Sequence, residues 1–162
     1  MLSPMLLANI TDYSVGLFIH ILAVVLAFGP TFGYGFVMSV APQYPQATPA
    51  ILTGIQRIDK YLVNPGMIVL LLAGIYLLAE GPWEMSDSFI GLGFLAIIVL
   101  FGLQHGFFGP GLRKAKALAE RDLEAGDSLS PEFEALSRKL GQIGTLAGLI
   151  VVVTIFFMVV KP

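Results

Sequence analysis

The chain has 162 residues, of which 56% are hydrophobic and 12% are charged, and its formal net charge is −2. A soluble domain has too little polar surface to cover so many apolar side chains, so this composition indicates an integral membrane protein in a lipid bilayer. The length suits a single domain, residues 1–162, with four spans of about 20 residues and one modest polar excursion. Because the chain contains no cysteine, disulfides, iron–sulfur clusters and thiolate metal sites are excluded.

Apolar runs predict an all-α fold, a four-helix transmembrane bundle. Proline at position 30 follows Gly29 inside the first run and should kink that helix, because proline lacks an N–H and its ring clashes with the preceding turn. Three prolines predict a loop over residues 41–49, with helix resuming near Ala50. The spans are expected at about residues 13–40, 62–79, 88–108 and 143–160.

A helical hairpin is predicted between the third and fourth spans, at about residues 111–140. Gly126 suits a helix C-cap, and Ser130-Pro131 suits the N-cap and first turn of the next helix. Side chains able to close its seam are Leu118, Leu123, Phe133, Leu136 and Leu140, with Lys116 and Glu120 as an i,i+4 pair on a wet face. The hairpin is either a solvated spacer or a docking surface for a protein partner.

Basic residues are concentrated after the first and third predicted spans. These segments share one side of a four-span protein, and they hold every Lys and Arg except Lys161. The positive-inside rule therefore places the hairpin in the cytoplasm and both termini outside, in a bacterial-type inner membrane.

His20 is the clearest candidate for a functional residue, because an ionisable side chain inside a membrane is costly and usually functional. Its helical face carries the small residues Gly16, Ala23, Ala27 and Thr31, which let a neighbouring helix approach. We therefore expect the imidazole to point into the bundle. There it would coordinate haem iron, copper or zinc, relay protons, or serve only as a structural histidine bonded to another helix.

His105 is a second candidate ligand, with a merely interfacial position as the alternative. It lies in Gly102-Leu103-Gln104-His105-Gly106, near the cytoplasmic end of the third span. At about 1.5 Å per residue, His20 lies roughly 12 Å below the outer surface and His105 roughly 27 Å. This axial offset favours separate positions over one metal held by both.

A polar cluster runs into the second span, and its members are Arg57, Asp59, Lys60, Tyr61, Asn64 and Pro65. Arg57 and Lys60 are either snorkelling anchors, with Asp59 paired to one of them, or ligands for the acidic groups of an amphiphile such as the propionates of a porphyrin. In the second case the helix break at Pro65 opens backbone groups toward a cavity near His105.

Glycine pairs at small-xxx-small spacing predict packing faces within the chain, or contacts in a homo-oligomer. The pairs are Gly29/Gly33, Gly102/Gly106 and Gly144/Gly148. No nucleophile motif or phosphate-binding loop appears, and acids balance the basic hairpin. Hydrolase, nucleotide-binding and nucleic-acid-binding functions are therefore excluded.

Residues 17–25 (LFIHILAVV) followed by Phe28-Gly29 resemble the first helix of the HemJ-type protoporphyrinogen oxidases and of the copper-resistance protein D group, including its uncharacterised four-helix relatives. Residues 57–61, 64–68 and Gly74 are similar to the second-helix segment of HemJ, and Gln104-His105-Gly106 resembles the histidine-glycine at the end of its third helix. The resemblance to HemJ implies b-type haem bound by histidine and oxidation of protoporphyrinogen. The resemblance to the copper-resistance protein D group implies metal handling across the membrane.

The sequence differs from the HemJ pattern at two places. Phe36 stands where HemJ proteins usually have an arginine, and Gly91-Leu92-Gly93 stands where they usually have a lysine. The histidines are therefore carried over as candidates without the oxidase activity. Our first hypothesis is a small membrane protein that binds haem b or copper through His20, with His105 as a further ligand, for redox or cofactor handling. An enzyme of this kind would be a haem-dependent oxidoreductase. The second hypothesis is a structural or accessory subunit that docks a partner, and a transporter has less support.

Overall fold

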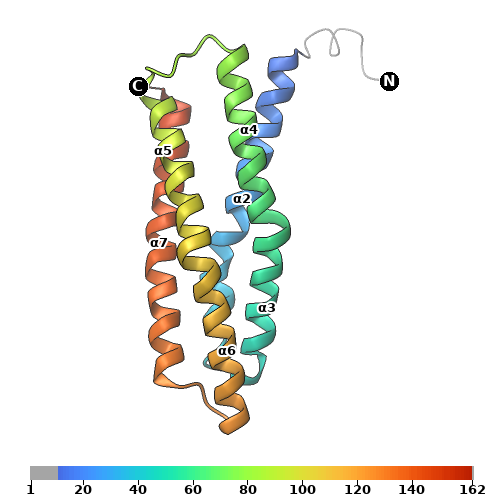
Figure 1. Cartoon of the computed structure of the whole chain (residues 1–162), viewed down its shortest axis with the longest axis vertical. Helices are drawn as coiled ribbons and strands as arrows, with labels where there is room; N and C mark the ends of the chain where they lie inside the picture. The colour runs from blue at the N-terminus through green and yellow to red at the C-terminus, as the bar shows by residue number, and fades with distance from the viewer. Residues whose placement is uncertain (1–10, 162) are drawn as a thin grey trace, which may run out of the picture.

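The apolar runs form four long helical rods that lie side by side (Figure 1). The structure is a computed structural model, and it describes residues 11–161. Every regular element in this part of the chain is helical, and each rod is long and apolar enough to cross a membrane. The predicted all-α fold with four transmembrane helices is therefore confirmed.

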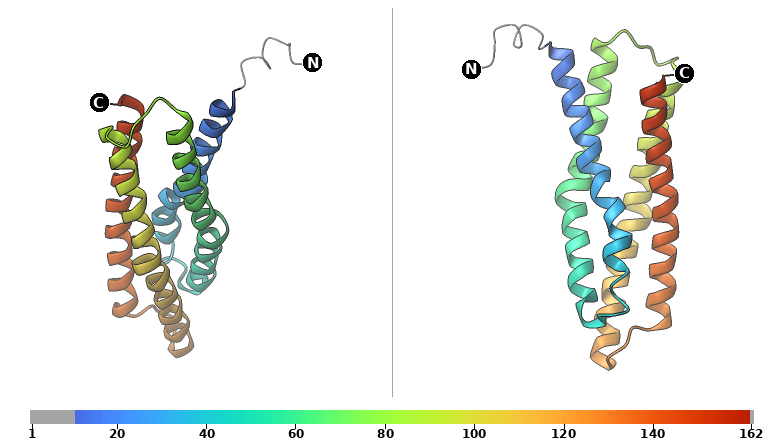
Figure 2. Two further views of the ribbon diagram at one scale, coloured as in Figure 1. Left: turned by 45° about the horizontal axis from the view of Figure 1, so that its top comes forward. Right: turned by 180° about the vertical axis from the view of Figure 1, so that it is seen from behind.

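Helix α2 (Asp12–Met38) is the first rod. Thr11 caps it by accepting a hydrogen bond from the backbone N–H of Ser14 at 3.2 Å, and Asp12 places an acid at the positive end of the helix. The helix continues through Pro30, which has no N–H to donate to the preceding turn. Figure 2 shows the axis of α2 changing direction about midway along its length, as expected for an internal proline.

The second rod combines η1 (Pro45–Ala47), α3 (Thr48–Ile58), η2 (Asp59–Val63) and α4 (Asn64–Glu80). Its helical part begins earlier than the predicted start near Ala50. Pro45 and Pro49 lie in first turns, where the missing N–H has no helical partner anyway, so they begin helices rather than prevent them. The predicted loop at residues 41–49 is therefore too long.

The third rod is one uninterrupted run of α5 (Ser88–Leu103), η3 (Gln104–Phe108) and α6 (Gly109–Ala125), and α7 (Pro131–Val160) is the fourth. The predicted hairpin forms between α6 and α7. Gly126 lies at the end of α6, and the Ser130 hydroxyl accepts a hydrogen bond from the backbone N–H of Phe133 at 3.3 Å. Both predicted caps are thus present.

The hairpin does not stand free, because α3 packs against it. Leu118 and Phe133 are buried in the seam as predicted, whereas Leu123 lies outside the cluster. Apolar side chains of the amphipathic helix α3 complete this core. Its buried members are Leu52, Ile55, Leu112, Ala115, Leu118, Ala119 and Phe133. Helix α3 therefore covers much of the apolar seam of the hairpin.

Two short π-helical segments, η2 and η3, interrupt the second and third rods at matching points. In η2 the N–H of Asn64 bonds to the carbonyl of Asp59, five residues back, and in η3 the N–H of Gly109 bonds in the same way to Gln104. A proline follows each donor directly and cannot continue the α-helical ladder. The first residue of each π segment is polar, Asp59 in η2 and Gln104 in η3.

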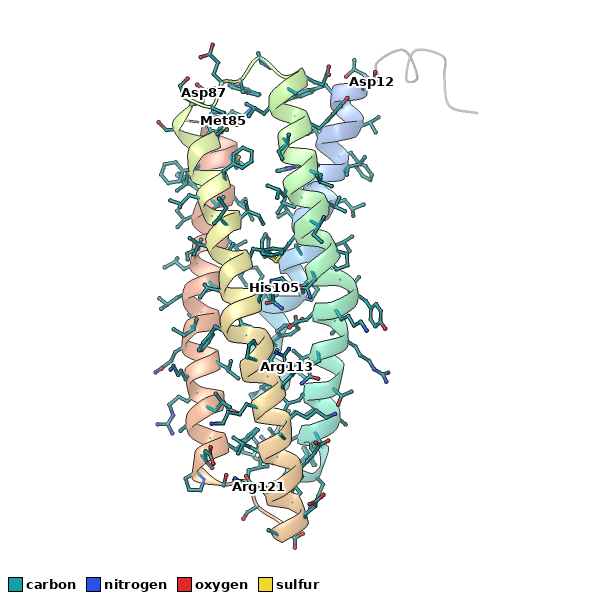
Figure 3. The ribbon with its side chains drawn as sticks, viewed as in Figure 1. Asp12, Met85, Asp87, His105, Arg113 and Arg121 are labelled. Atoms are coloured by element: carbon teal, nitrogen blue, oxygen red, sulfur yellow. The ribbon has the colours of Figure 1, made fainter. Side chains whose placement is uncertain are left out.

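Charged residues are segregated along the bundle. Asp12 and Asp87 lie at one end, and Arg113 and Arg121 lie in the other half (Figure 3). At the first end, the Lys161 ammonium lies 4.1 Å from the centre of the Trp83 ring. We call this the terminal end of the bundle and the opposite one the hairpin end.

Candidate functional site

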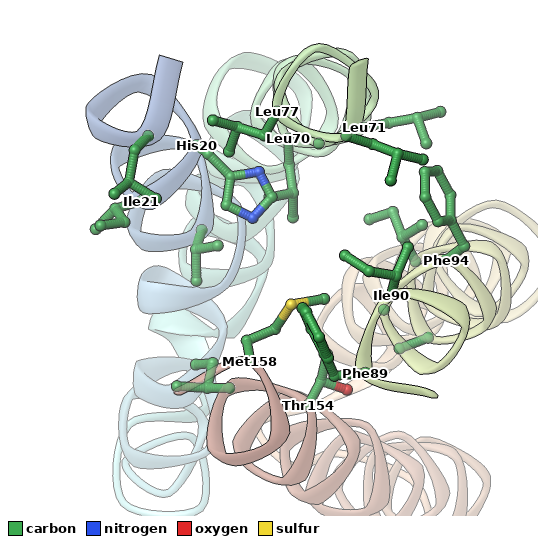
Figure 4. A pocket seen from close by; sticks show the side chains of 18 of the residues that line it. His20, Ile21, Leu70, Leu71, Leu77, Phe89, Ile90, Phe94, Thr154 and Met158 are labelled. Carbon is green, nitrogen blue, oxygen red and sulfur yellow. The ribbon is translucent and has the colours of Figure 1, made fainter. Parts of the chain in front are cut away.

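A cavity of about 590 Å³ opens between the four rods near the terminal end, and we call it the His20 cavity (Figure 4). Helices α2, α4, α5 and α7 all contribute to its wall, which is almost wholly apolar. Figure 4 shows His20 facing Met158 and Phe89 across the open space. Met158, from the far end of the sequence, is thus brought to the same cavity as the histidine.

The imidazole of His20 points into the bundle, as the small residues on its helical face predict. Gly16, Ala23 and Ala27 are buried on α2. Gly74 of α4 lies beside the ring, and a Cβ at that position would be in ordinary van der Waals contact with Nδ1 at 3.7 Å. Nδ1 is buried and makes no hydrogen bond of standard geometry, the backbone of Leu70 is the hydrogen-bonding neighbour of the ring, and Figure 4 shows the other ring nitrogen directed toward the open space.

Few polar groups accompany His20. The Thr154 hydroxyl donates a hydrogen bond to the backbone carbonyl of Ile150 at 2.8 Å. Lys161 and Trp83 lie at the mouth of the cavity, and Trp83 donates a hydrogen bond to the Tyr13 hydroxyl at 3.3 Å. Sequence reasoning missed Met158 and Lys161. The only available signal was that Lys161 is the one cation expected at that end of the bundle.

His105 is placed away from His20. Its side chain is exposed on the outside of the third rod, its ring stacks on Phe101 with centroids 4.2 Å apart, and Nδ1 lies 3.1 Å from the Phe101 carbonyl oxygen. Within residues 11–161, no group of three or more His, Asp or Glu side chains could hold a metal ion. The structure therefore does not bring the two histidines into one site.

Arg57 and Lys60 also lie outside the His20 cavity. Both are exposed, and the Lys60 ammonium lies 5.3 Å from the centre of the Tyr61 ring. The structure thus separates the two predicted propionate ligands from His20. Asn64, next to the predicted break at Pro65, has a buried side-chain oxygen with no hydrogen-bond partner.

Asp59 belongs to a second cavity of about 520 Å³, the Asp59 cavity, which lies closer to the hairpin. Its carboxyl group is buried and accepts a hydrogen bond from the Tyr34 hydroxyl at 2.7 Å, with the Gln104 side chain as a further hydrogen-bonding neighbour. Asp59 is therefore bonded to Tyr34 of α2 and not to Arg57 or Lys60. Tyr34 and Gln104 were missed by the sequence analysis, because no local pattern relates residues of three separate rods.

The two cavities share part of their walls. Phe28, Leu100 and Val151, from three different rods, line both of them. These three side chains belong to the central apolar core of the bundle. An apolar layer therefore separates the imidazole from the carboxyl group.

The glycine pairs behave differently from one another. A Cβ at Gly148 would lie 3.3 Å from the Phe32 ring, so this part of α7 packs within the chain as predicted. Gly102 and Gly106 have no such neighbour among the described residues. The closest helix approach is at Gly66, where a Cβ would lie 2.9 Å from the backbone nitrogen of Ala27.

Comparison with known proteins gives one match. A family model described as "Predicted integral membrane protein (DUF2269)" matches residues 15–162. No curated protein and no solved structure matches the chain. Membership of the copper-resistance protein D and HemJ superfamily therefore stays a prediction. Since the match covers nearly the whole chain, the protein belongs to the DUF2269 family of predicted integral membrane proteins.

Proposed function

We propose that the protein binds b-type haem in the His20 cavity, with His20 as an axial ligand, and serves redox or cofactor handling in the membrane. The observation that carries this proposal is the ring of His20, which presents one nitrogen to a large apolar cavity between the four rods (Figure 4). The volume of about 590 Å³ lies within the usual range for small-molecule sites.

The donor set favours haem over a bare copper or zinc ion. A protein-bound zinc ion takes about four ligands, and the described residues offer no group of three His, Asp or Glu. The porphyrin supplies its own four nitrogens, so a single histidine is sufficient. Met158 of α7 lines the same cavity, and its thioether would be the candidate for a second protein ligand of the iron.

The mouth of the cavity suits the polar edge of such a ligand. Lys161 is at the mouth, where its ammonium group is able to pair with a carboxylate, and the rest of the wall excludes water. A haem held there supplies one-electron transfer, whose potential is set by the axial ligands and the apolar surroundings. The chain's own residues bind the group, orient it and keep water away.

An absorbance spectrum of the purified protein, titrated with haemin in detergent, tests the proposal. We expect a Soret band at one haem per chain that is lost in His20→Ala and kept in His105→Ala, the matched control with an exposed histidine. Met158→Leu should retain haem with altered bands. Protein that takes up no haem, or a band that depends on His105 and not on His20, would overturn the proposal.

We also propose that the hairpin end faces the cytoplasm of a bacterial-type plasma membrane, so that the His20 cavity lies toward the outer leaflet. The concentration of Lys and Arg after the first and third spans supports this orientation. Cysteines introduced singly at Asp127 and Ser86 test it, because the native chain has none. A membrane-impermeant maleimide applied to intact cells should label the residue at 86 only, and the reverse pattern would reject the orientation.

A further inference from the structure

Asp59 is a buried acid without a counter-charge. Its exposed fraction is 6%, and none of the ion pairs among the described residues involves it. The neighbouring cations Arg57 and Lys60 are exposed, and no other charged side chain lines the Asp59 cavity. A buried carboxylate is costly unless it is both hydrogen-bonded and paired with a positive charge. In the ligand-free chain a bound proton neutralises such a group, and a cation that enters the cavity would replace this proton as the partner of the carboxylate.

Hydrogen bonds within the chain hold the carboxyl group without saturating it. Tyr34 donates to Oδ1, and Gln104 is a second hydrogen-bonding neighbour. A carboxylate has about four lone-pair sites, so part of its accepting capacity is left over. The cavity lies directly beside these three side chains, which all line it. The unused capacity is thus available to a ligand in the cavity.

Aromatic rings surround the same space. The cavity lining includes Phe28, Phe32, Tyr34 and Phe108, and aromatic faces attract cations within about 6 Å of the ring centre. The Ser137 hydroxyl of α7 also lines the cavity, and it is buried without a hydrogen-bond partner. Most of the remaining lining is aliphatic, so the space suits an apolar body that carries a positive charge.

We propose that the Asp59 cavity binds a lipophilic organic cation, with Asp59 as its counter-ion and the aromatic side chains as its walls. A small inorganic cation fits less well, because calcium takes six to eight oxygen ligands, whereas the lining offers one carboxylate, the Gln104 amide and a few hydroxyl groups. The site is separate from the His20 cavity and does not depend on haem.

Tetraphenylphosphonium, a lipophilic cation, and tetraphenylborate, an anion of nearly the same size and shape, make a matched pair of probes. Equilibrium dialysis of radiolabelled probe against the full chain in lipid nanodiscs should show saturable binding of one phosphonium per chain and no saturable binding of the borate. Asp59→Asn should weaken phosphonium binding at least about tenfold, since the counter-charge is lost while the Asn oxygen still accepts from Tyr34. Asp12→Asn, at an exposed acid outside both cavities, is the control and should bind as the wild type does.

A second variant tests the place of binding without touching the acid. Gly144 lines the cavity, and a Cβ there would meet only the Phe108 ring at 4.0 Å, so Gly144→Leu fills the space and should also abolish binding. Absence of saturable phosphonium binding, wild-type affinity in Asp59→Asn or Gly144→Leu, or equal binding of the borate would each overturn the proposal.

Discussion

The His20 cavity and the Asp59 cavity share a wall of Phe28, Leu100 and Val151, yet they hold their polar side chains in different ways. His20 makes no hydrogen bond of standard geometry at Nδ1, and its ring packs beside the Leu70 backbone and Gly74 of α4. Asp59 is fixed by Tyr34 and Gln104 from two other rods. The first cavity thus offers an imidazole nitrogen of His20, and the second offers the Asp59 carboxyl group held by two hydrogen-bonding neighbours.

This difference has a structural origin in the helix geometry. The backbone of α2 near His20 is regular, and small residues alone turn the ring inward. Asp59 and Gln104 each begin a π segment that precedes a proline, and the two segments bring both side chains to one cavity. The acid site therefore depends on contacts between rods, whereas the histidine site depends on space between them.

The largest effect on the free energy of unfolding is expected at the close contact between α2 and α4, two helices that help to form both cavities. Gly66→Ala places a Cβ 2.9 Å from the backbone nitrogen and 3.0 Å from the Cα of Ala27, and backbone atoms cannot move aside without separating α2 from α4. We expect a loss of about 1–3 kcal/mol in unfolding free energy, or more, measured by thermal unfolding in detergent. Gly102→Ala is the control, since nothing lies within 4 Å of that position, and equal melting temperatures for the two variants would contradict this reason.

Tyr34→Phe tests the bracing of Asp59 alone. The variant removes the 2.7 Å hydrogen bond to the buried carboxyl group while keeping the aromatic wall. We expect a loss of about 1–2 kcal/mol in unfolding free energy, because the acid is left with one neighbour fewer. Tyr44→Phe, at an exposed tyrosine with no side-chain hydrogen bond in the described part, should leave the unfolding free energy unchanged. If both variants unfold alike, Tyr34 does not brace the acid.

His20→Leu should change the stability of haem-free protein least of these cavity variants. The substitution removes only a hydrogen-bonding contact of poor geometry, to the backbone of Leu70, and an aliphatic side chain suits the apolar wall, so we expect a change below about 1 kcal/mol. Denaturant unfolding of protein stripped of haem measures it. A loss as large as that of Tyr34→Phe would mean that His20 is bonded within the chain, and the comparison between the two cavities would fail.

Long apolar runs made the four helices predictable, because lipid leaves a spanning segment no alternative to helix. The helical face of His20 was predictable for a similar reason, since Gly16, Ala23 and Ala27 recur at helical spacing on one side of α2. The caps at Gly126 and Ser130 followed from local chemistry alone. These features depend on residues that are close together in the sequence.

The π segments and the partners of the two cavities were not predictable in the same way. Pro65 marked an interruption, but whether a helix breaks, kinks or adds a residue there is decided by packing between rods. That packing turned Asp59 toward Tyr34 and left Arg57 and Lys60 outside. Met158 lines the same cavity as His20 because α7 runs along the whole bundle (Figure 1). A single sequence carries no record of such long-range neighbours.

The smallest and most local effect is expected at the hairpin end, where the buried acid Asp122 is paired with Arg121 and Glu132 is exposed. The side chain of Ser130 and its backbone N–H, which donates to Asp122 at 2.8 Å, together with Arg121 lower the pKa of Asp122 to about 2 from its ordinary 3.8. A lowered pKa means that the contribution to stability is present above about pH 4 and is lost as the pH falls from about 4 to about 2. Lys114 also lowers the pKa of Glu132, so the ion pair of Glu132 likewise contributes stability that is lost as the pH falls.

Hydrogen exchange followed by mass spectrometry across this pH range, after correction for the intrinsic exchange rate, should show the α6–α7 turn loosening while the amides near His20 stay protected. Asp122→Asn is the control, and its turn should already be loose at pH 5 and change less on acidification, because the remaining response comes from Glu132. The turn differs from the Asp59 cavity in that its acids already have cations, so acid there breaks pairs that the chain itself supplies. Equal loosening at both ends of the bundle would show that the acid response is global and not a property of the hairpin.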